Sequence, residues 1–196
     1  MQENRRSNPE RSAATRDALV SAGRELFLTK GYAATGTPEV VARAGVTRGA
    51  LYHHFRDKLA LFEAVVAEEW AAVAAAIDAG GGPAHPLADL IEGARRYMAA
   101  MSDPHRVSLL LIDAPNVLGW ARARSLDTAR LALLQGLRAA LGESDTDVVL
   151  LGEALSSAFD RAALGVSDGE DGEAWMRALR RLLEQLAPEA DSDLTT

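Results

Sequence analysis

The sequence predicts an all-α protein in which a small N-terminal domain is joined by one long helix to a larger C-terminal domain. Alanine, leucine and arginine are abundant and runs of β-branched residues are scarce, which favours helix over sheet. Apolar side chains recur every three or four residues along most of the 196-residue chain, as on the buried face of a helix. Proline stands at expected helix starts and glycine near expected ends, at Pro83, Pro86, Pro104, Pro115, Gly31, Gly142 and Gly165.

Composition excludes several kinds of site. The chain has no cysteine, which excludes a disulfide, a thiol nucleophile and a zinc–thiolate site. It has no His–Glu metal motif, nucleophile elbow or phosphate-binding loop, so we expect no cofactor and no enzyme activity. No apolar run reaches the ~18–20 residues of a membrane span and no signal-peptide pattern opens the chain. We therefore expect a cytoplasmic protein with no membrane partner.

The N-terminal segment predicts a tail followed by a supporting helix. Residues 1–11 offer no apolar stripe, so we expect a flexible tail. From about Ser12 to Lys30 a helix carries apolar residues on one stripe and ends at Gly31. This helix is expected to brace the two short helices that follow, closing a three-helix domain over residues 12–58.

The stretch from Thr35 to Lys58 predicts two short helices joined by a tight turn. Gly45 follows the first apolar helix and can adopt the left-handed conformation that ends a helix at no steric cost. Thr47 is a good N-cap for the second helix, and Asp57 for the helix that comes next. A short helix, a turn and a second helix form a helix-turn-helix, whose second helix can enter the major groove of DNA.

The exposed face of this motif carries residues suited to DNA. They are Arg48, Gly49, Tyr52 and His53 on the second helix, with Arg43 across the turn and Lys58 just beyond. Arginine pairs bidentately with guanine, and tyrosine and lysine bind phosphates. A small solvated hairpin with incidental basic residues would have the same spacing. Charge favours DNA: residues 1–58 hold 10 Lys/Arg and 6 Asp/Glu, a net charge of +4, whereas the remainder carries −11.

The residues of this region closely resemble the N-terminal domain of the TetR family of bacterial transcriptional regulators, from about Arg16 to Val66. The matching positions are Phe27, Gly31-Tyr32, Ala44-Gly45-Val46-Thr47, Leu51-Tyr52-His53-His54-Phe55 and Lys58. The resemblance implies that Thr47, Arg48, Gly49, Tyr52 and His53 lie on the recognition helix, and that Tyr52 and Lys58 hold phosphates.

One departure from the family leaves the cap of the first motif helix open. Gly36 stands where the family usually has Ser or Thr, and Thr37 before Pro38 offers another cap. Thr35 and Thr37 are therefore both candidates for the threonine that contacts a phosphate.

Beyond the motif, residues 59–82 are expected to be a connecting helix and the linker Gly80-Gly81-Gly82-Pro83. The remainder predicts helices at about 86–101, 104–113, 115–141, 146–166 and 170–186. The resemblance implies that residues 83–196 form a helical domain that binds an unidentified small-molecule effector and dimerises.

Two sets of residues are candidates for these roles. The pocket candidates are Trp70, Tyr97, Met101, Leu110, Asp113, Trp120 and Phe159. Each apolar one is equally explained by core packing, and Asp113 by capping a helix that begins at Pro115. The candidates for a homodimer interface are Leu151, Leu155, Phe159, Trp175, Leu179, Leu182 and Leu186, which would form a four-helix bundle with a second chain. The alternative is that these two helices complete the core of the monomer.

Together with its resemblance to the TetR family, the sequence therefore predicts a ligand-responsive regulator, a repressor, that binds a pseudo-palindromic double-stranded DNA operator as a homodimer and is released by a small apolar or amphipathic effector. A helical module that binds a small molecule without using DNA is the alternative.

Overall fold

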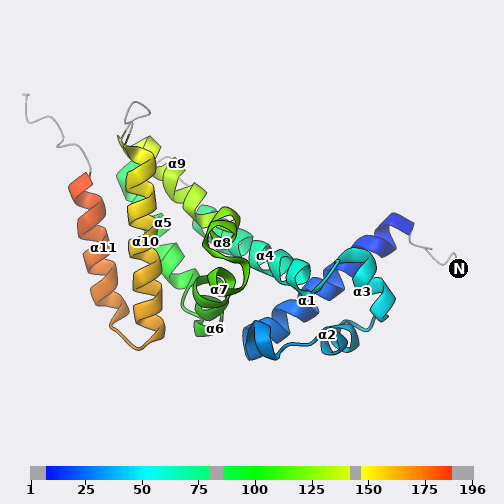
Figure 1. Cartoon of the computed structure of the whole chain (residues 1–196). Helices are drawn as coiled ribbons and strands as arrows, with labels where there is room; N and C mark the ends of the chain where they lie inside the picture. Colours follow the sequence, from blue (N-terminus) through cyan, green and yellow to red (C-terminus); the bar gives the residue numbers. More distant parts are fainter. Residues whose placement is uncertain (1–7, 80–85, 142–146, 187–196) are drawn as a thin grey trace, which may run out of the picture. The chain divides into compact units, whose positions relative to one another are not determined.

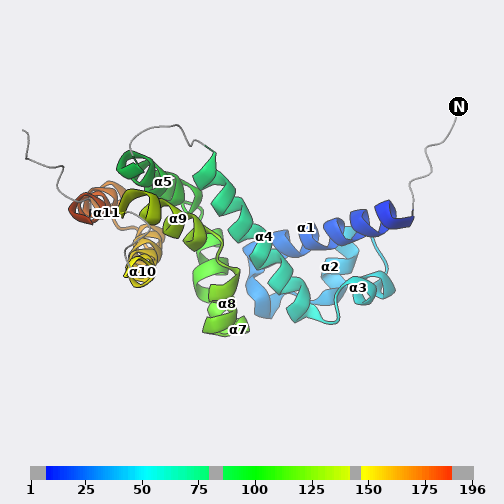
Figure 2. The same cartoon turned by 90° about the horizontal axis from the view of Figure 1, so that it is seen from above.

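The computed structural model describes residues 8–79, 86–141 and 147–186, and every regular element in these ranges is a helix (Figures 1 and 2). None of these helices is both long enough and apolar enough to cross a membrane. The described residues form two compact units. The first contains the residues up to Glu69 together with Ser108–Leu126, and the second contains Trp70–Val107 and the residues from Asp127 onward.

The first unit is built around a long N-terminal helix. Its elements are α1 (Asn8–Ala34), α2 (Thr37–Ala44), α3 (Arg48–His54), the first part of α4 (Lys58–Asp78), the π-helix η1 (Ser108–Asp113), α7 (Ala114–Leu118) and α8 (Trp120–Leu126). Helices α2 and α3 pack against α1 and against each other (Figure 2). Three aromatic rings occupy the corner: Phe62 lies 5.1 Å from Phe27 and 4.8 Å from Tyr32, edge to face in both pairs. The aromatic cluster fixes α4 against the end of α1.

Helix α1 differs from the prediction at both ends. It begins at Asn8, so the described residues 8–11, which we expected in the tail, are helical. The reason is local, because Pro9 and Glu10 favour the first turn of a helix. At the other end Gly31 has φ 75° and ψ 170°, and a helical turn resumes after it as far as Ala34. Gly31 therefore kinks α1 where we expected it to end the helix.

The second unit packs the rest of α4 with α5 (Pro86–Ala100), α6 (Pro104–Val107), α9 (Ala129–Leu141), α10 (Val148–Ser167) and α11 (Gly172–Leu186). Helix α5 contacts α9, α10 and α11, and α10 runs beside α9 and α11 (Figure 1). Glycine allows a close approach: a Cβ on Gly152 of α10 would overlap the Leu134 side chain of α9. Small residues on α10 therefore bring the two helices together.

Two of the predicted helices are interrupted. The expected helix at 115–141 breaks into α7, α8 and α9, because Gly119 adopts φ 82° and Asp127 caps α9 by accepting the N–H of Arg130 at 3.0 Å. The expected helix at 104–113 becomes α6 followed by η1. Residues 108–126, which we expected in the C-terminal domain, group with the first unit because η1 packs on α1. The Gly80–Pro83 linker and Gly142 lie outside the described residues.

Candidate nucleic-acid interface

The turn between α2 and α3 has the geometry expected from its sequence. Gly45 is left-handed, with φ 65° and ψ 29°. The N–H groups of Gly45 and Val46 donate to the carbonyls of Ala42 and Val41, at 3.3 and 3.2 Å, which satisfies the end of α2. The Thr47 hydroxyl accepts the N–H of Ala50 at 3.2 Å and caps α3. These local bonds fix where α3 begins and hence which side chains its first turn presents.

Helix α3 exposes a compact polar face. Arg48, Gly49, Tyr52 and His53 are all exposed. The Arg48 guanidinium lies 5.5 Å from the centre of the Tyr52 ring. Hydrogen bonding to the side chain of Thr37, and then to Arg48, lowers the pKa of the Tyr52 phenol from its usual 10.0. Thr37, the first residue of α2, therefore joins Arg48 and Tyr52 of α3 in one cluster.

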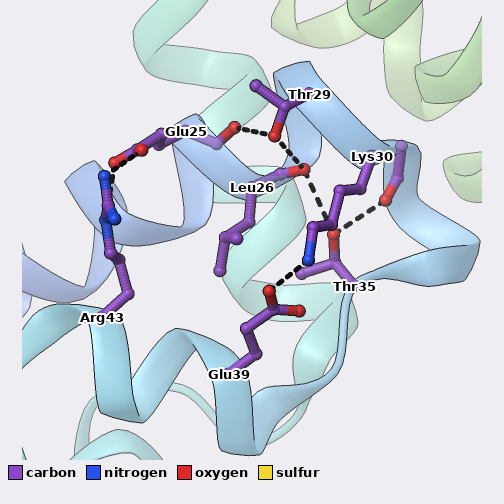
Figure 3. Close-up of polar contacts among 8 residues, drawn as sticks. Glu25, Leu26, Thr29, Lys30, Thr35, Glu39 and Arg43 are labelled. Atoms are coloured by element: carbon purple, nitrogen blue, oxygen red, sulfur yellow. Dashed lines mark hydrogen bonds and ion pairs between the residues drawn. The ribbon is translucent and has the colours of Figure 1, made fainter.

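Thr35 does not belong to this face, which corrects one of the two threonine candidates. Its side chain is only 1% exposed, and its hydroxyl donates to the carbonyl of Gly31 at 2.8 Å and to that of Leu26 at 3.3 Å (Figure 3). Both acceptors belong to α1 around its kink. The Thr35 hydroxyl therefore stabilises the kink of α1 and does not face outward. Gly36, and not a threonine, occupies the N-cap position of α2.

Arg43 is exposed and forms an ion pair with Glu25 of α1. Its Nε donates to Glu25 Oε2 at 2.8 Å, and its Nη2 contacts Glu25 Oε1 (Figure 3). A second ion pair, between Lys30 and Glu39, also connects α1 with α2. In the free protein the charge of Arg43 is therefore largely neutralised by Glu25.

Lys58 also has internal partners. Its ammonium donates to the carbonyls of Tyr32 at 2.8 Å and Thr35 at 3.0 Å, and it lies 4.0 Å from the centre of the Tyr32 ring. Asp57 caps α4 as expected, because its Oδ1 accepts the N–H of Ala60 at 2.7 Å. An ammonium has three donors, so one N–H of Lys58 remains for a phosphate.

The histidines of α3 do not form a metal site. The rings of His53 and His54 lie 5.1 Å apart at an angle of 76°. In the part of the chain that the structure describes, no group of His, Asp and Glu side chains is arranged to hold a metal ion.

A separate cavity of about 340 Å³ lies within the second unit, between the end of α4 and helices α5, α9 and α10. Two of the predicted pocket residues, Tyr97 and Phe159, line it. Sequence reasoning missed Leu90, Leu133 and Gly136, which also line it. The amphipathic pattern of α5 marks Leu90 as inward-facing, but no sequence signal indicates that the helices leave a space there.

The other pocket candidates lie elsewhere. Trp70, Met101 and Leu110 are buried and do not line the cavity, which agrees with the alternative of core packing. Trp120 is 68% exposed. Asp113 lies at the kink of α1, where its Oδ2 accepts the N–H of Tyr32 at 3.4 Å, and its side chain does not cap α7. Their place on helices was predictable, but their neighbours were not.

The candidates for a dimer interface divide into two groups. Leu155, Phe159 and Leu179 are buried within the monomer, Leu179 with only 1% exposure, so they complete its core instead of offering a surface. Leu182 is 49% exposed, and Leu151, Trp175 and Leu186 are half-buried. The structure adds Val149 and Leu150, which are exposed on α10, Leu150 by 71%. The outward apolar surface of α10 and α11 therefore contains four of the seven residues we expected and, in addition, Val149 and Leu150.

Comparisons with known proteins match both parts of the chain. Residues 19–65 match the sequence model described as bacterial regulatory proteins, tetR family, and residues 87–189 match that of the tetracyclin repressor-like C-terminal domain. The HTH-type transcriptional repressor BepR of Brucella suis is 42% identical over 55 residues, which are 28% of this chain and 26% of that protein. The transposon Tn10 TetC protein of Escherichia coli is 28% identical over 118 residues, 60% of each chain. The matches thus span less than two thirds of these relatives.

A solved structure matches almost the whole chain. The crystal structure of a TetR-family transcriptional regulator from Pectobacterium atrosepticum is 27% identical, with a TM-score of 0.62 over 92% of this chain and 95% of that one. The C-terminal family match alone covers more than half of the sequence. With a helix-turn-helix at residues 37–54 and a helical unit beyond it, the chain belongs to the TetR family of bacterial transcriptional regulators.

Proposed function

We propose that this chain is a ligand-responsive repressor that binds a pseudo-palindromic operator as a homodimer and leaves it when a small apolar or amphipathic effector occupies the cavity of the second unit. The observation that carries the proposal is the cluster of half-buried Thr37, the first residue of α2, with Tyr52 and Arg48, which are exposed on α3, Arg48 at its first position; hydrogen bonding to Thr37 and then to Arg48 lowers the pKa of the Tyr52 phenol. A helix-turn-helix reads DNA with this part of its second helix.

Each residue of the face has a distinct proposed role. Arg48, the first residue of α3, reads a guanine through two parallel hydrogen bonds, and Tyr52 gives its hydroxyl to a phosphate. A Cβ on Gly49 would find only the Thr47 hydroxyl, 3.9 Å away, so the backbone there is open to close approach by the DNA. Thr47 and His53 flank this contact on α3.

Two residues outside α3 add proposed phosphate contacts. Arg43 would exchange Glu25 for a phosphate, and Lys58 would donate its third N–H to another.

The proposed homodimer uses the outer faces of α10 and α11. Exposed Leu150 and Leu182 and half-buried Leu151, Trp175 and Leu186 supply the apolar surface. A two-fold axis through such a bundle makes the contact self-complementary. Two recognition helices separated by one turn of DNA, about 34–36 Å, would then read the two half-sites of a pseudo-palindrome.

The proposed effector acts through a difference in affinity between two states of the dimer. Occupation of the cavity favours the state whose recognition helices do not fit the operator, and the affinity ratio sets how much DNA is released. The repressor direction follows BepR, which is named a transcriptional repressor and is 42% identical over 55 residues.

The experiment measures binding of the purified protein to DNA from its own upstream region at two salt concentrations, with a scrambled competitor. We expect Arg48→Ala to lose roughly 1–3 kcal/mol of specific binding and to relax base preference at one position. Tyr52→Ala should weaken binding to every sequence, whereas Arg138→Ala, which removes an exposed charge from α9, serves as the control. Unchanged specific binding in both α3 variants would contradict this interface. Ligand binding without any salt-dependent DNA affinity would favour the alternative module.

A further inference from the structure

Among the residues that the structure describes, two buried polar side-chain atoms have no hydrogen-bond partner: the hydroxyl oxygen of Thr128 and Nε of Arg130. Of these two residues, Arg130 lines the cavity of the second unit and Thr128 does not. A buried donor without a partner has lost its hydrogen bonds to water and gained none in return, so such groups are rare in folded proteins. The Nε–H of Arg130 therefore lacks an acceptor that the described residues do not supply.

The rest of the Arg130 side chain is held in place. Arg130 lies in the first turn of α9, and its Nη1 donates to Glu153 Oε1 of α10 at 2.7 Å. The side chain is 20% exposed. Because the guanidinium is planar and its donors form a rigid fork, the bond to Glu153 also restricts the direction of the Nε–H bond. The ion pair with Glu153 thus compensates the charge of Arg130 and leaves the Nε–H for another acceptor.

Two other donors on the wall of the cavity already have partners. Arg96 contacts Glu92 at 3.0 Å and donates to the Ile77 carbonyl at 3.2 Å. The Tyr97 hydroxyl donates to Asp160 at 2.7 Å. Neither side chain needs a ligand to satisfy it, in contrast to Nε of Arg130.

Much of the remaining wall is apolar. Leu90, Leu133 and Ala129 line it, and the rings of Tyr97 and Phe159 lie 5.6 Å apart, edge to face. An apolar body would be buried against this wall, out of water. The cavity therefore combines an apolar wall with a buried, unsatisfied donor, and sites for small molecules use a few such polar groups to orient an apolar ligand.

From this arrangement we infer that the cavity binds an amphipathic molecule with a trigonal oxygen acceptor, a carbonyl or a carboxylate, that accepts the Nε–H of Arg130 while its apolar body contacts Leu90, Tyr97 and Phe159. This inference rests on the proposed function, because it names the chemical class of the effector. Since Nε is buried in the free protein, the acceptor reaches it when side chains of the wall rearrange, and rotamer changes of this kind are common on binding. A ligand without an acceptor leaves the Nε–H buried and unpaired.

The test uses three ligands that share a hexyl chain on a trigonal carbon: 2-octanone with a carbonyl, heptanoate with a carboxylate, and 2-methyl-1-octene with no acceptor. Each is titrated into the full-length protein without DNA, and binding is followed by NMR of the leucine methyl groups. Arg130→Lys keeps a cation for Glu153 but places a methylene where Nε stood. It should lower the affinity for 2-octanone roughly tenfold, as expected for one hydrogen bond from a charged donor, and leave that for 2-methyl-1-octene unchanged.

The matched control makes the same substitution away from the cavity. Arg138 is exposed on α9 and does not line the cavity, so Arg138→Lys should bind all three ligands like the wild type. The inference is overturned if Arg130→Lys leaves 2-octanone affinity unchanged, or if it weakens 2-octanone and 2-methyl-1-octene equally.

A second measurement observes the Nε–H of the wild-type protein directly. In nitrogen NMR, 2-octanone should shift the Arg130 Nε–H resonance and slow its exchange with water, whereas 2-methyl-1-octene should do neither. If 2-octanone binds in the cavity without changing this resonance, Arg130 Nε is not the donor and the inference is overturned.

Heptanoate distinguishes the two kinds of acceptor. Four carboxylates also line the cavity and oppose a negative ligand, so we expect uncharged 2-octanone to bind more tightly: Asp78, Asp89, Glu92 and Asp127. Tighter binding of heptanoate, lost in Arg130→Lys, would also support the inference and would identify the acceptor as a carboxylate.

Addition of operator DNA separates this inference from the proposed function. If 2-octanone binds with the expected dependence on Arg130 but does not release DNA, the ligand class is supported and effector release is contradicted. If 2-methyl-1-octene releases DNA equally from the wild type and Arg130→Lys, and 2-octanone does no better, effector release is supported and the ligand class is overturned.

Discussion

Arg43 on α2 and Glu25 on α1 form a two-pronged ion pair, with Arg43 Nε 2.8 Å from Glu25 Oε2 (Figure 3). Both side chains are about half exposed, at 56% and 49%, so the pair adds little to folding stability, about 0–1 kcal/mol. The pair matters more for the proposed DNA contact, in which Glu25 would compete with a phosphate for the guanidinium of Arg43.

We predict that Glu25→Gln raises DNA affinity without a large loss of stability. In the variant Arg43 no longer has to leave Glu25 to contact its phosphate, so affinity should rise while the slope of log K against log salt, which follows the number of phosphate contacts, stays unchanged. A salt titration of operator binding measures this slope. Glu39→Gln is the control, because it breaks the neighbouring α1–α2 ion pair of Lys30, a residue outside the proposed interface. An equal change in both variants would show that loss of negative charge alone is responsible.

Tyr52 and Tyr32 should titrate in opposite directions. Hydrogen bonds to Thr37, and then to Arg48, lower the pKa of Tyr52, whereas burial, with a smaller contribution from Asp57, raises the pKa of Tyr32. Carbon NMR of labelled tyrosine should therefore show Tyr52 ionising below pH 10.0 and Tyr32 above it. Thr37→Val should return the Tyr52 pKa toward its usual value and leave Tyr32 unchanged. A Tyr52 pKa at or above that of Tyr32 would contradict the observed cluster.

Two glycines of the helix-turn-helix should respond oppositely to alanine. Gly45 has φ 65° with open space around it, so Gly45→Ala costs about 1 kcal/mol through backbone strain alone. Gly49 lies inside α3, where alanine favours the helix, so Gly49→Ala should stabilise the fold by up to about 1 kcal/mol. Thermal unfolding checks both changes. DNA affinity should nonetheless fall in Gly49→Ala, since the added methyl group faces the proposed DNA contact.

Glu92 should give a stabilising interaction that is lost only in strong acid. Hydrogen bonding to Arg95, with help from Arg96, lowers the pKa of Glu92 from 4.5 to about 2. Because the folded-state pKa is the lower one, the interaction is fully present above pH 4.5 and disappears as the pH falls toward about 2. The difference in Tm between wild type and Glu92→Gln should therefore be constant above pH 4.5 and shrink below it. A difference that does not change between pH 4.5 and 2 would contradict this assignment.

Features with local causes were predictable from the sequence. Gly45 ends α2, Thr47 caps α3 and Asp57 caps α4, because each depends only on backbone groups within a few residues. The all-helical fold was confirmed for a related reason, since periodic apolar residues determine helices wherever their partners lie.

Features that depend on distant neighbours were not predictable. Thr35 has the spacing of a phosphate-binding residue, but its hydroxyl is used by the carbonyls of Gly31 and Leu26. Leu179 has the pattern of an interface residue and is buried in its own unit, whereas Leu150 on α10 is exposed. Helical periodicity shows that a face is apolar, but which helix covers that face is decided by tertiary packing. The cavity was not predictable for the same reason, because it depends on how four helices pack around a space.

The bond between Asp113 and the N–H of Tyr32 joins residues 81 positions apart, within a first unit that includes Ser108–Leu126. The simplest hybrid regulator would exchange the N-terminal helices of two proteins at a single splice point. If the splice lay at the end of α4, α1 would come from one protein, whereas η1, α7 and α8, which belong to the same unit, would come from the other. Transplanting the first unit needs three crossovers, one in α4 near Glu69 and one at each end of residues 108–126, so that Asp113 travels with Tyr32.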